Sequence, residues 1–178
     1  DFEELHPGFS INVATSTKTT DLSRDRSVDL VIRYGTGHLE EGMFHRLLFT
    51  ERIGAFGSPQ LLTKSDLTEM TLLETRWQNP ELPRVTWDHW LKKKGFKPKD
   101  FTKRRQFDEE QHVLQAGLAG QGLILISCLL VEDILARGWL EPFDPAYLLD
   151  GLSYCILATK ERSRARKNRI FIEWLLDQ

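Results

Sequence analysis

The chain has 178 residues, of which 40% are hydrophobic and 28% charged, and its formal net charge is -2. This length allows a substantial core in one large domain or two small lobes, and the near-neutral charge gives no general attraction to nucleic acid. No apolar run approaches the roughly 18 residues of a membrane span, and the acidic start DFEELHPGFS has no secretory signal. We therefore expect a cytoplasmic protein without membrane contact.

Alternation of apolar and polar residues predicts the elements in the first half of the chain. We expect strands at 9–15 and 28–32, with a short polar helix between them, then an extended stretch from 44 to 57 and a strand at 70–75. Ser58 is expected to cap a short helix that has Pro59 at its first position.

The second half shows clearer helix signals. Thr86 is expected to cap a helix that turns Trp87 and Trp90 inward and ends before Gly95. Asp108, with Gln111 in capping-box position, predicts a helix to about residue 119. The remaining predicted elements are a strand at 122–126, a helix from 128 to 137 that Ser127 caps and Gly138 ends, a strand at 152–159, and an amphipathic helix at 165–178 with Ile170, Phe171, Trp174 and Leu175 turned inward. Alternating strands and helices predict an α/β fold with a largely parallel sheet in two lobes.

Three glycines lie close together in QAGLAGQGLILIS, at 117, 120 and 122. A phosphate-binding glycine loop follows a strand and opens a helix, whereas here the glycines close a predicted helix and a strand follows. We therefore expect Gly120 to end the helix in a left-handed conformation and Gly117 to let another element approach closely.

The sequence contains no catalytic signature. GxSxG, HExxH and P-loop motifs are missing, and the histidines are scattered singly at 6, 38, 45, 89 and 112. The two cysteines, Cys128 and Cys155, lie in separate apolar segments, which predicts buried reduced thiols without a disulfide or a metal cluster. We expect a binding domain of the α/β class that has no enzymatic activity and no cofactor.

Seven segments in order carry a resemblance to a known family: DFEELHPGFSINV, VDLVIRYGTG, LLFTERIGAFGSPQLL, WDHWLKKKG, FDEEQHVLQAGLAGQGLILIS, LVEDILARGWLEPF and RIFIEWLLDQ. Together they resemble the effector-binding domain of LysR-type transcriptional regulators, in the branch that includes regulators of glycine cleavage and of β-lactamase expression. The resemblance implies two Rossmann-like α/β lobes of the type 2 periplasmic-binding-protein kind, with a ligand cleft between them. Lobe I would hold residues 1–55 and 149–178, and lobe II residues 56–148.

Family members begin this domain with a further strand and most of a long helix, and their winged helix-turn-helix lies upstream of that. The resemblance therefore implies that this chain is an effector-binding domain without its first strand, and that DNA is contacted only through the absent helix-turn-helix part. It also implies a homodimer or tetramer, formed through the strand after Pro7 and the helix from about Glu110 to Ala119. A fragment of a periplasmic-type solute-binding protein is the alternative.

Ligands of open α/β sheets lie beyond the carboxyl ends of strands, which in lobe I places Arg33, Tyr34 and Gly35 at the candidate site. The resemblance puts the same three residues at the cleft. Arg33 can hold a carboxylate of the effector, or it can pair with a protein carboxylate such as Glu109.

In lobe II the candidate site is the start of the helix at Glu109, Glu110 and Gln111, where relatives often carry serine or threonine. The two carboxylates have two explanations. They can serve the positive end of the helix dipole, or they can select an amine-bearing effector, such as an amino acid whose carboxylate meets Arg33. The effector class expected from the sequence is thus an amino acid or a small organic acid.

Further candidate contacts follow from hydroxyl and aromatic side chains. Tyr154 corresponds to a cleft tyrosine of the β-lactamase-regulator relatives, or it is simply a half-buried strand residue. Ser58 can serve as cap and ligand contact together, and Trp77 either lines the cleft or belongs to the core. The hydroxyl donors expected on the lobe I rim are Thr15, Ser16 and Thr17.

Eight basic residues and one acidic residue lie between Lys92 and Arg105. Direct contact with DNA is one reading of this run. We favour a solvated face, because only Phe96 and Phe101 interleave with the charges.

Overall fold

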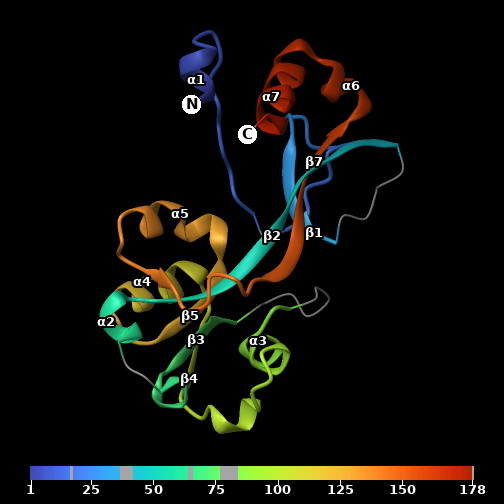
Figure 1. The fold of residues 1–178 in the computed structure, drawn as a ribbon. Helices are drawn as coiled ribbons and strands as arrows, with labels where there is room; N and C mark the ends of the chain where they lie inside the picture. The colour runs from blue at the N-terminus through green and yellow to red at the C-terminus, as the bar shows by residue number, and fades with distance from the viewer. Residues whose placement is uncertain (17, 37–41, 64–65, 77–83, 178) are drawn as a thin grey trace. The chain divides into compact units, whose positions relative to one another are not determined.

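The computed structural model describes residues 1–16, 18–36, 42–63, 66–76 and 84–177. It divides into two compact units: unit 1 comprises Asp1–Phe49 and Leu152–Gln178, and unit 2 comprises Thr50–Gly151. The chain passes from unit 1 to unit 2 within strand β2 (Met43–Gly57) and returns within strand β7 (Leu149–Thr159) (Figure 1). In the part of the chain that the structure describes, no helix has the length and apolar character needed to cross a membrane.

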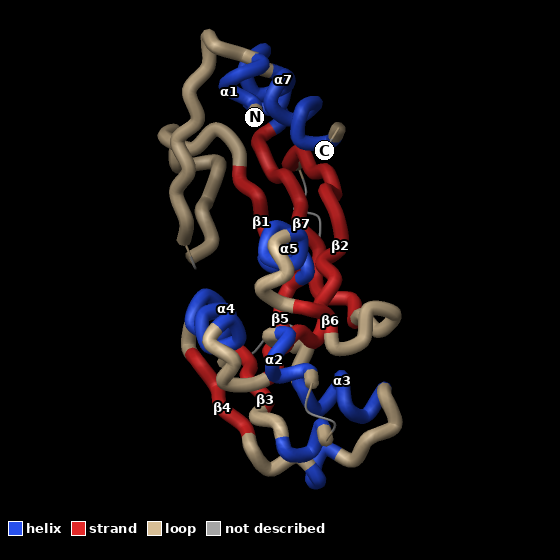
Figure 2. The backbone as a smooth tube through the Cα atoms, turned by 60° about the vertical axis from the view of Figure 1, so that its left-hand side comes forward, coloured by secondary structure: helices blue, strands red, loops and turns tan. Residues whose placement is uncertain are grey.

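Unit 1 pairs a short strand with the end of a long one and packs helices near both termini of the chain. Strand β1 (Val31–Gly35) runs antiparallel to β7, with Arg33 opposite Cys155. The helices are α1 (Phe2–Leu5), α6 (Lys160–Arg164) and α7 (Arg166–Leu176), and α1 lies beside α7 (Figure 2). The buried Phe2 ring lies 5.1 Å from the Phe171 ring and 5.4 Å from the Trp174 ring, both edge-on. An aromatic cluster therefore joins the first helix to the last.

Two predictions for the first thirty residues were wrong. Residues 9–15 form no strand, and Val13 is 84% exposed; no described strand pairs with this segment, and alternation alone cannot supply a partner. The predicted polar helix is a pair of turns, because Asp21 accepts hydrogen bonds from the backbone and hydroxyl of Ser23, and Asp25 does the same for Ser27. The strand predicted at 28–32 begins only at Val31 and includes Arg33, Tyr34 and Gly35, which were expected to follow it.

Unit 2 is built on a sheet of the order β2-β5-β3-β4, with β6 (Glu141–Pro142) beside β2. Strand β3 (Leu72–Thr75) runs parallel to both β4 (Arg104–Phe107) and β5 (Leu123–Ser127), whereas β2 runs antiparallel to β5. The sheet is therefore mixed, and the prediction of a largely parallel sheet was wrong. An apolar strand buried on both faces reads the same in either pairing direction, so the sequence pattern did not encode this feature.

Both faces of the unit 2 sheet are covered (Figures 1 and 2). Leu72 packs on the side of helix α3 (Trp87–Lys93), and Leu73 packs on the side of α4 (Glu110–Leu118) and α5 (Cys128–Ala136). The side chains of Trp87, Trp90 and Leu91 are fully buried, as the helix pattern predicted. Short helices complete the unit: α2 (Pro59–Leu62), η1 (Leu67–Glu69) and η2 (Pro98–Asp100).

Local capping signals were confirmed at most helix ends. Ser58 accepts from the Leu61 backbone N–H, Thr86 accepts from that of His89, and Gly120 has a φ of +69° after α4. Gly117 of helix α4 packs against strand β5 of the same unit, since a Cβ at Gly117 would lie 2.6 Å from Ile124 Cγ2. The close approach predicted from this glycine is therefore internal to unit 2.

The start of α4 differs from the prediction. Glu109, not Asp108, is the N-cap and it makes no side-chain cap hydrogen bond, so the capping box with Gln111 does not form. Asp108 instead pairs with Arg76 at 3.5 Å. Strand β4 was not predicted, because its first three residues are exposed at the edge of the sheet and give no apolar signal.

The basic run between Lys92 and Arg105 is partly neutralised within unit 2. Lys94 pairs with Asp144 and lies 4.8 Å from the centre of the Tyr147 ring. Arg104 pairs with Asp88 at 2.5 Å. The exposed lysines of the run are Lys92, Lys93, Lys97, Lys99 and Lys103.

Gly122 is expected to tolerate no side chain. A Cβ at this position would lie 2.2 Å from the carbonyl oxygen of Thr71, which is backbone and accepts the Leu123 N–H at 2.9 Å. We predict that Gly122→Ala lowers the free energy of unfolding by about 1–3 kcal/mol in urea denaturation. The control is Gly8→Ala, where a Cβ meets nothing within 4 Å and φ is not positive. Equal midpoints for the two variants would contradict the prediction.

Candidate functional site

The candidate site in unit 2 lies at the edge where three parallel strands end. Because β3, β4 and β5 share one direction, their last residues Thr75, Phe107 and Ser127 lie at the same edge of the sheet, which we call the carboxyl edge. Helix α5 starts directly after β5, and α4 starts two residues after β4. This is the position where open α/β sheets bind ligands, since backbone N–H groups of the helix starts converge there.

Glu110 is the first residue of α4 and the central ionisable group of the carboxyl edge. Glu51 of β2 lies at the same edge, because Ile53 pairs with Ser127 and the strands are antiparallel, and its side chain is only 5% exposed. Burial raises the pKa of Glu110, and the neighbouring Glu51 charge raises that pKa further, while the Ser127 N–H opposes the rise.

Two hydroxyl groups at the carboxyl edge are buried without a hydrogen-bond partner among the described residues: Thr75 Oγ1 and Ser127 Oγ. Ser127 is 2% exposed, and although it is the N-cap of α5 its side chain makes no cap hydrogen bond. Buried polar groups are nearly always paired, so unpaired ones at a strand end indicate a functional position.

Cys128, the first residue of α5, belongs to the same edge. Burial raises the pKa of its thiol; the Arg52 charge lowers that pKa and the Glu51 charge raises it. The two arginines near the edge have carboxylate partners of their own, since Arg52 pairs with Asp150 at 3.3 Å and Arg76 with Asp108 at 3.5 Å. The carboxyl edge therefore combines two carboxyl groups that repel each other with hydroxyls that have no partner among the described residues. This arrangement favours a cationic, hydrogen-bonding ligand.

The residues predicted in unit 1 occupy paired strands. Tyr34 lies opposite Tyr154, with ring centres 4.8 Å apart, and its hydroxyl oxygen accepts the Leu152 N–H at 3.2 Å. The Tyr154 ring also contacts Phe49 at 5.0 Å. Neighbouring side chains of a strand point to opposite faces, so Arg33 and Gly35 lie on the face opposite to Tyr34.

The other predicted site residues are spread over the chain. Thr15 and Ser16 are exposed, and Ser16 Oγ binds the backbone of Lys18. Thr17 and Trp77 lie outside the described residues. Ser58 caps α2 at the amino end of β5, away from the carboxyl edge, because Phe56 pairs with Ile124.

Glu109 and Gln111 are exposed beside Glu110.

Sequence reasoning missed Glu51, Thr75 and Ser127 as site residues. The same rule that selected Arg33 could have found Thr75 and Ser127, because both are hydroxyl residues at the end of a predicted strand. Glu51 had no such signal, since only the pairing of β2 with β5 brings it there. Within the described ranges, no group of three or more His, Cys, Asp or Glu side chains could hold a metal ion.

The mixed sheet and its helix-bearing carboxyl edge define an α/β binding domain of the two-lobed periplasmic-binding-protein-like type, and the predicted fold class is confirmed. All 178 residues, 1–178, match the family model described as LysR substrate binding domain, and the chain belongs to this family.

Among curated relatives, the chain is 28% identical over 189 residues to the uncharacterized HTH-type transcriptional regulator YhjC of Escherichia coli (strain K12). This alignment covers 98% of this chain and 60% of the relative. It is 25% identical over 183 residues to the glycine cleavage system transcriptional activator of the same strain, covering 98% of this chain and 57% of the relative. The chain thus spans about 60% of the length of these relatives.

Solved structures show the same fold. The effector domain of the transcriptional regulator AmpR of Pseudomonas aeruginosa has a TM-score of 0.76 at 22% identity, covering 99% of this chain and 84% of that one. The regulatory domain of CrgA from Neisseria meningitidis has a TM-score of 0.71 at 20% identity, covering 99% and 87%.

The raised pKa of Glu110 predicts a pH-dependent stability. Between the unfolded and the folded pKa the native carboxyl keeps its proton and the unfolded one does not, so the free energy of unfolding falls as pH rises through this window. We predict that Glu110→Gln removes this fall, measured by urea denaturation across pH 4–8. Glu109→Gln is the matched control because its side chain is exposed. Parallel pH profiles for wild type and Glu110→Gln would refute this assignment.

Proposed function

We propose that this chain is the effector-sensing part of a DNA-binding transcriptional regulator of the LysR type. Membership in the LysR substrate binding domain family supports this, and so do the names of the relatives, which are HTH-type regulators and a transcriptional activator. We propose further that the protein works as a cytoplasmic homodimer or tetramer and binds DNA through a helix-turn-helix part outside these residues. Its function is ligand binding rather than catalysis.

In this proposal, effector binding is coupled to DNA binding because the effector has different affinities for different conformations of the domain. An effector that binds one conformation of the domain more tightly than another shifts the population toward that conformation. DNA affinity then changes by the same coupling free energy, typically about 1–3 kcal/mol, and by reciprocity DNA changes effector affinity to the same extent.

We propose that the effector carries an amine and that its ammonium group binds at the carboxyl edge of unit 2. The observation that carries this proposal is the half-buried Glu110 carboxyl beside the buried Glu51 carboxyl. The hydroxyls of Thr75 and Ser127, which have no partner among the described residues, lie at the same edge. An ammonium group has three donors, so it can bind a carboxylate and the hydroxyl oxygens together. A bound cation also relieves the repulsion between the two carboxylates.

The exposed neighbours Glu109 and Gln111 remain candidate contacts in unit 2, and Arg33, Tyr34, Gly35 and Tyr154 remain candidate contacts in unit 1. Arg33 can bind a carboxylate bidentately. The helix-dipole explanation of the acidic residues accounts for Glu109 but not for the burial of Glu110 beside Glu51.

Calorimetric titration of the full-length protein with amino acids, simple amines and dicarboxylates tests the proposed effector class. We expect amine-bearing compounds to bind and Glu110→Gln to weaken them about 10- to 100-fold, the loss of one charge-assisted hydrogen bond. Affinity should rise as pH rises through the pKa of Glu110, because only the ionised carboxylate pairs with ammonium.

Glu132→Gln, which removes an exposed carboxylate of α5 outside the candidate contacts, provides the control and should cost little. Tighter binding of dicarboxylates, or equal losses in the two variants, would overturn the assignment of an amine to this edge. A separate gel-shift measurement of operator DNA with and without the bound amine tests the regulator itself, and unchanged DNA affinity would count against effector sensing.

A further inference from the structure

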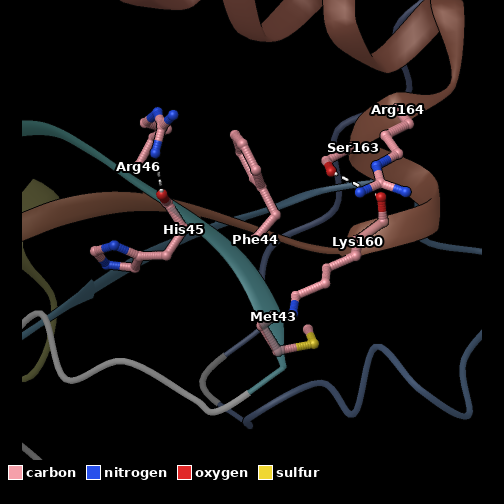
Figure 3. A pocket seen from close by; sticks show the side chains of 7 residues that line it. All are labelled: Met43, Phe44, His45, Arg46, Lys160, Ser163 and Arg164. Atoms are coloured by element: carbon pink, nitrogen blue, oxygen red, sulfur yellow. Dashed lines mark hydrogen bonds between the residues drawn. The ribbon is translucent and has the colours of Figure 1, made fainter.

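Unit 1 contains a pocket that the proposed function does not use. It has a volume of about 370 Å³ and lies between the beginning of β2 and helix α6 (Figure 3). Pockets that bind small molecules start at about 300 Å³, so one small organic molecule fits. Its lining residues are Met43, Phe44, His45, Arg46, Lys160, Ser163 and Arg164.

All charged side chains that line this pocket are positive, and His45 is counted as neutral. Arg46, Lys160 and Arg164 line it, and no carboxylate of the described residues lies within ion-pair distance of any of the three. Two cations of the neighbouring helix α7 are paired, since Lys167 binds Asp29 at 2.7 Å and Arg169 binds Glu173 at 3.7 Å. The pocket therefore brings together three cations that have no anionic partner among the described residues.

Helix α6 holds two of these cations on one face. Lys160 and Arg164 are four residues apart, the spacing at which side chains of a helix are neighbours. Two like charges at this spacing destabilise a helix unless an anion lies between them. Two kinds of hydrogen bond fix the position of helix α6. Thr159 caps it, and the Arg162 guanidinium donates to the carbonyl oxygens of Val28 and Asp25 at 2.7 Å each.

Strand β2 supplies the third cation together with an apolar wall. Phe44 and Arg46 lie on the same face of the strand, and the Arg46 guanidinium carbon is 5.3 Å from the centre of the Phe44 ring. Arg46 donates one hydrogen bond, to the His45 carbonyl oxygen at 3.2 Å, so other guanidinium N–H groups remain for a ligand. The His45 ring points to the opposite side of the strand (Figure 3), and we assign it no contact with the ligand.

We propose that this pocket is a second ligand site, which binds a small organic anion: a carboxylate on an apolar body. Lys160 and Arg164 of α6 bind the carboxylate, and Phe44 and Met43 cover the apolar part. Arg46, which lies across the Phe44 ring from these two residues (Figure 3), adds positive charge. The site is independent of the carboxyl edge in unit 2, and its ligand has the opposite charge to the amine proposed there.

Phenylacetate is the probe, with phenylacetamide as its uncharged counterpart and inorganic phosphate as an anion without an apolar body. In calorimetric titration of the full-length protein we expect phenylacetate to bind at least tenfold more tightly than either of the others. Arg164→Gln should weaken phenylacetate about tenfold, and Arg46→Gln should weaken it less. The matched control is Arg169→Gln, which removes the same charge from α7 outside the pocket. Urea denaturation of each variant verifies that it folds.

Several outcomes overturn this proposal. They are no binding of phenylacetate, equal binding of phenylacetamide, equal or tighter binding of phosphate, and equal losses in Arg169→Gln. The two sites fail separately: Glu110→Gln should leave phenylacetate binding unchanged, and Arg164→Gln should leave amine binding unchanged.

Discussion

The parallel pairing of β3 with both β4 and β5 is the constraint on which the rest of unit 2 depends. It requires Gly122, because the Leu123 N–H and the Thr71 carbonyl oxygen approach to 2.9 Å and leave no room for a Cβ between the chains. On the other side, the Leu72 N–H donates to the Lys103 carbonyl oxygen at 2.9 Å. Once the three strands share a direction, their carboxyl ends share an edge, and the helices that follow β4 and β5 must begin there.

The chemistry of the carboxyl edge follows from this geometry. Residues far apart in the sequence, Glu51, Glu110 and Ser127, meet at this edge, where Glu51 and Ser127 are buried. Burying two carboxyl groups side by side is unfavourable, and it costs more when hydroxyls nearby also lack partners. Perturbed titratable groups of this kind are common at functional sites. The unfavourable free energy of burying them is offset when a complementary ligand binds.

The two units carry opposite chemistry. The carboxyl edge of unit 2 is acidic and takes its shape from strand ends, whereas the pocket of unit 1 is basic and takes its shape from one strand and a five-residue helix. With both proposed sites, a regulator would respond to two compounds of different charge. Each compound would act through its own differential affinity for the conformations of the domain.

Local chemistry in the sequence determined a large part of this protein. The caps at Ser58 and Thr86, the helix end at Gly120 and the buried face of α3 depend on residues within one or two turns, and all were predicted correctly. The order of seven segments determined the family and thereby the fold class. Tertiary structure decided what depends on distant partners: the mixed sheet, the edge strand β4 and the face on which Arg33 lies. It also decided the core of the candidate site, because Glu51 meets Glu110 only through the pairing of β2 with β5, and the direction and register of that pairing are not written in the periodicity of either strand.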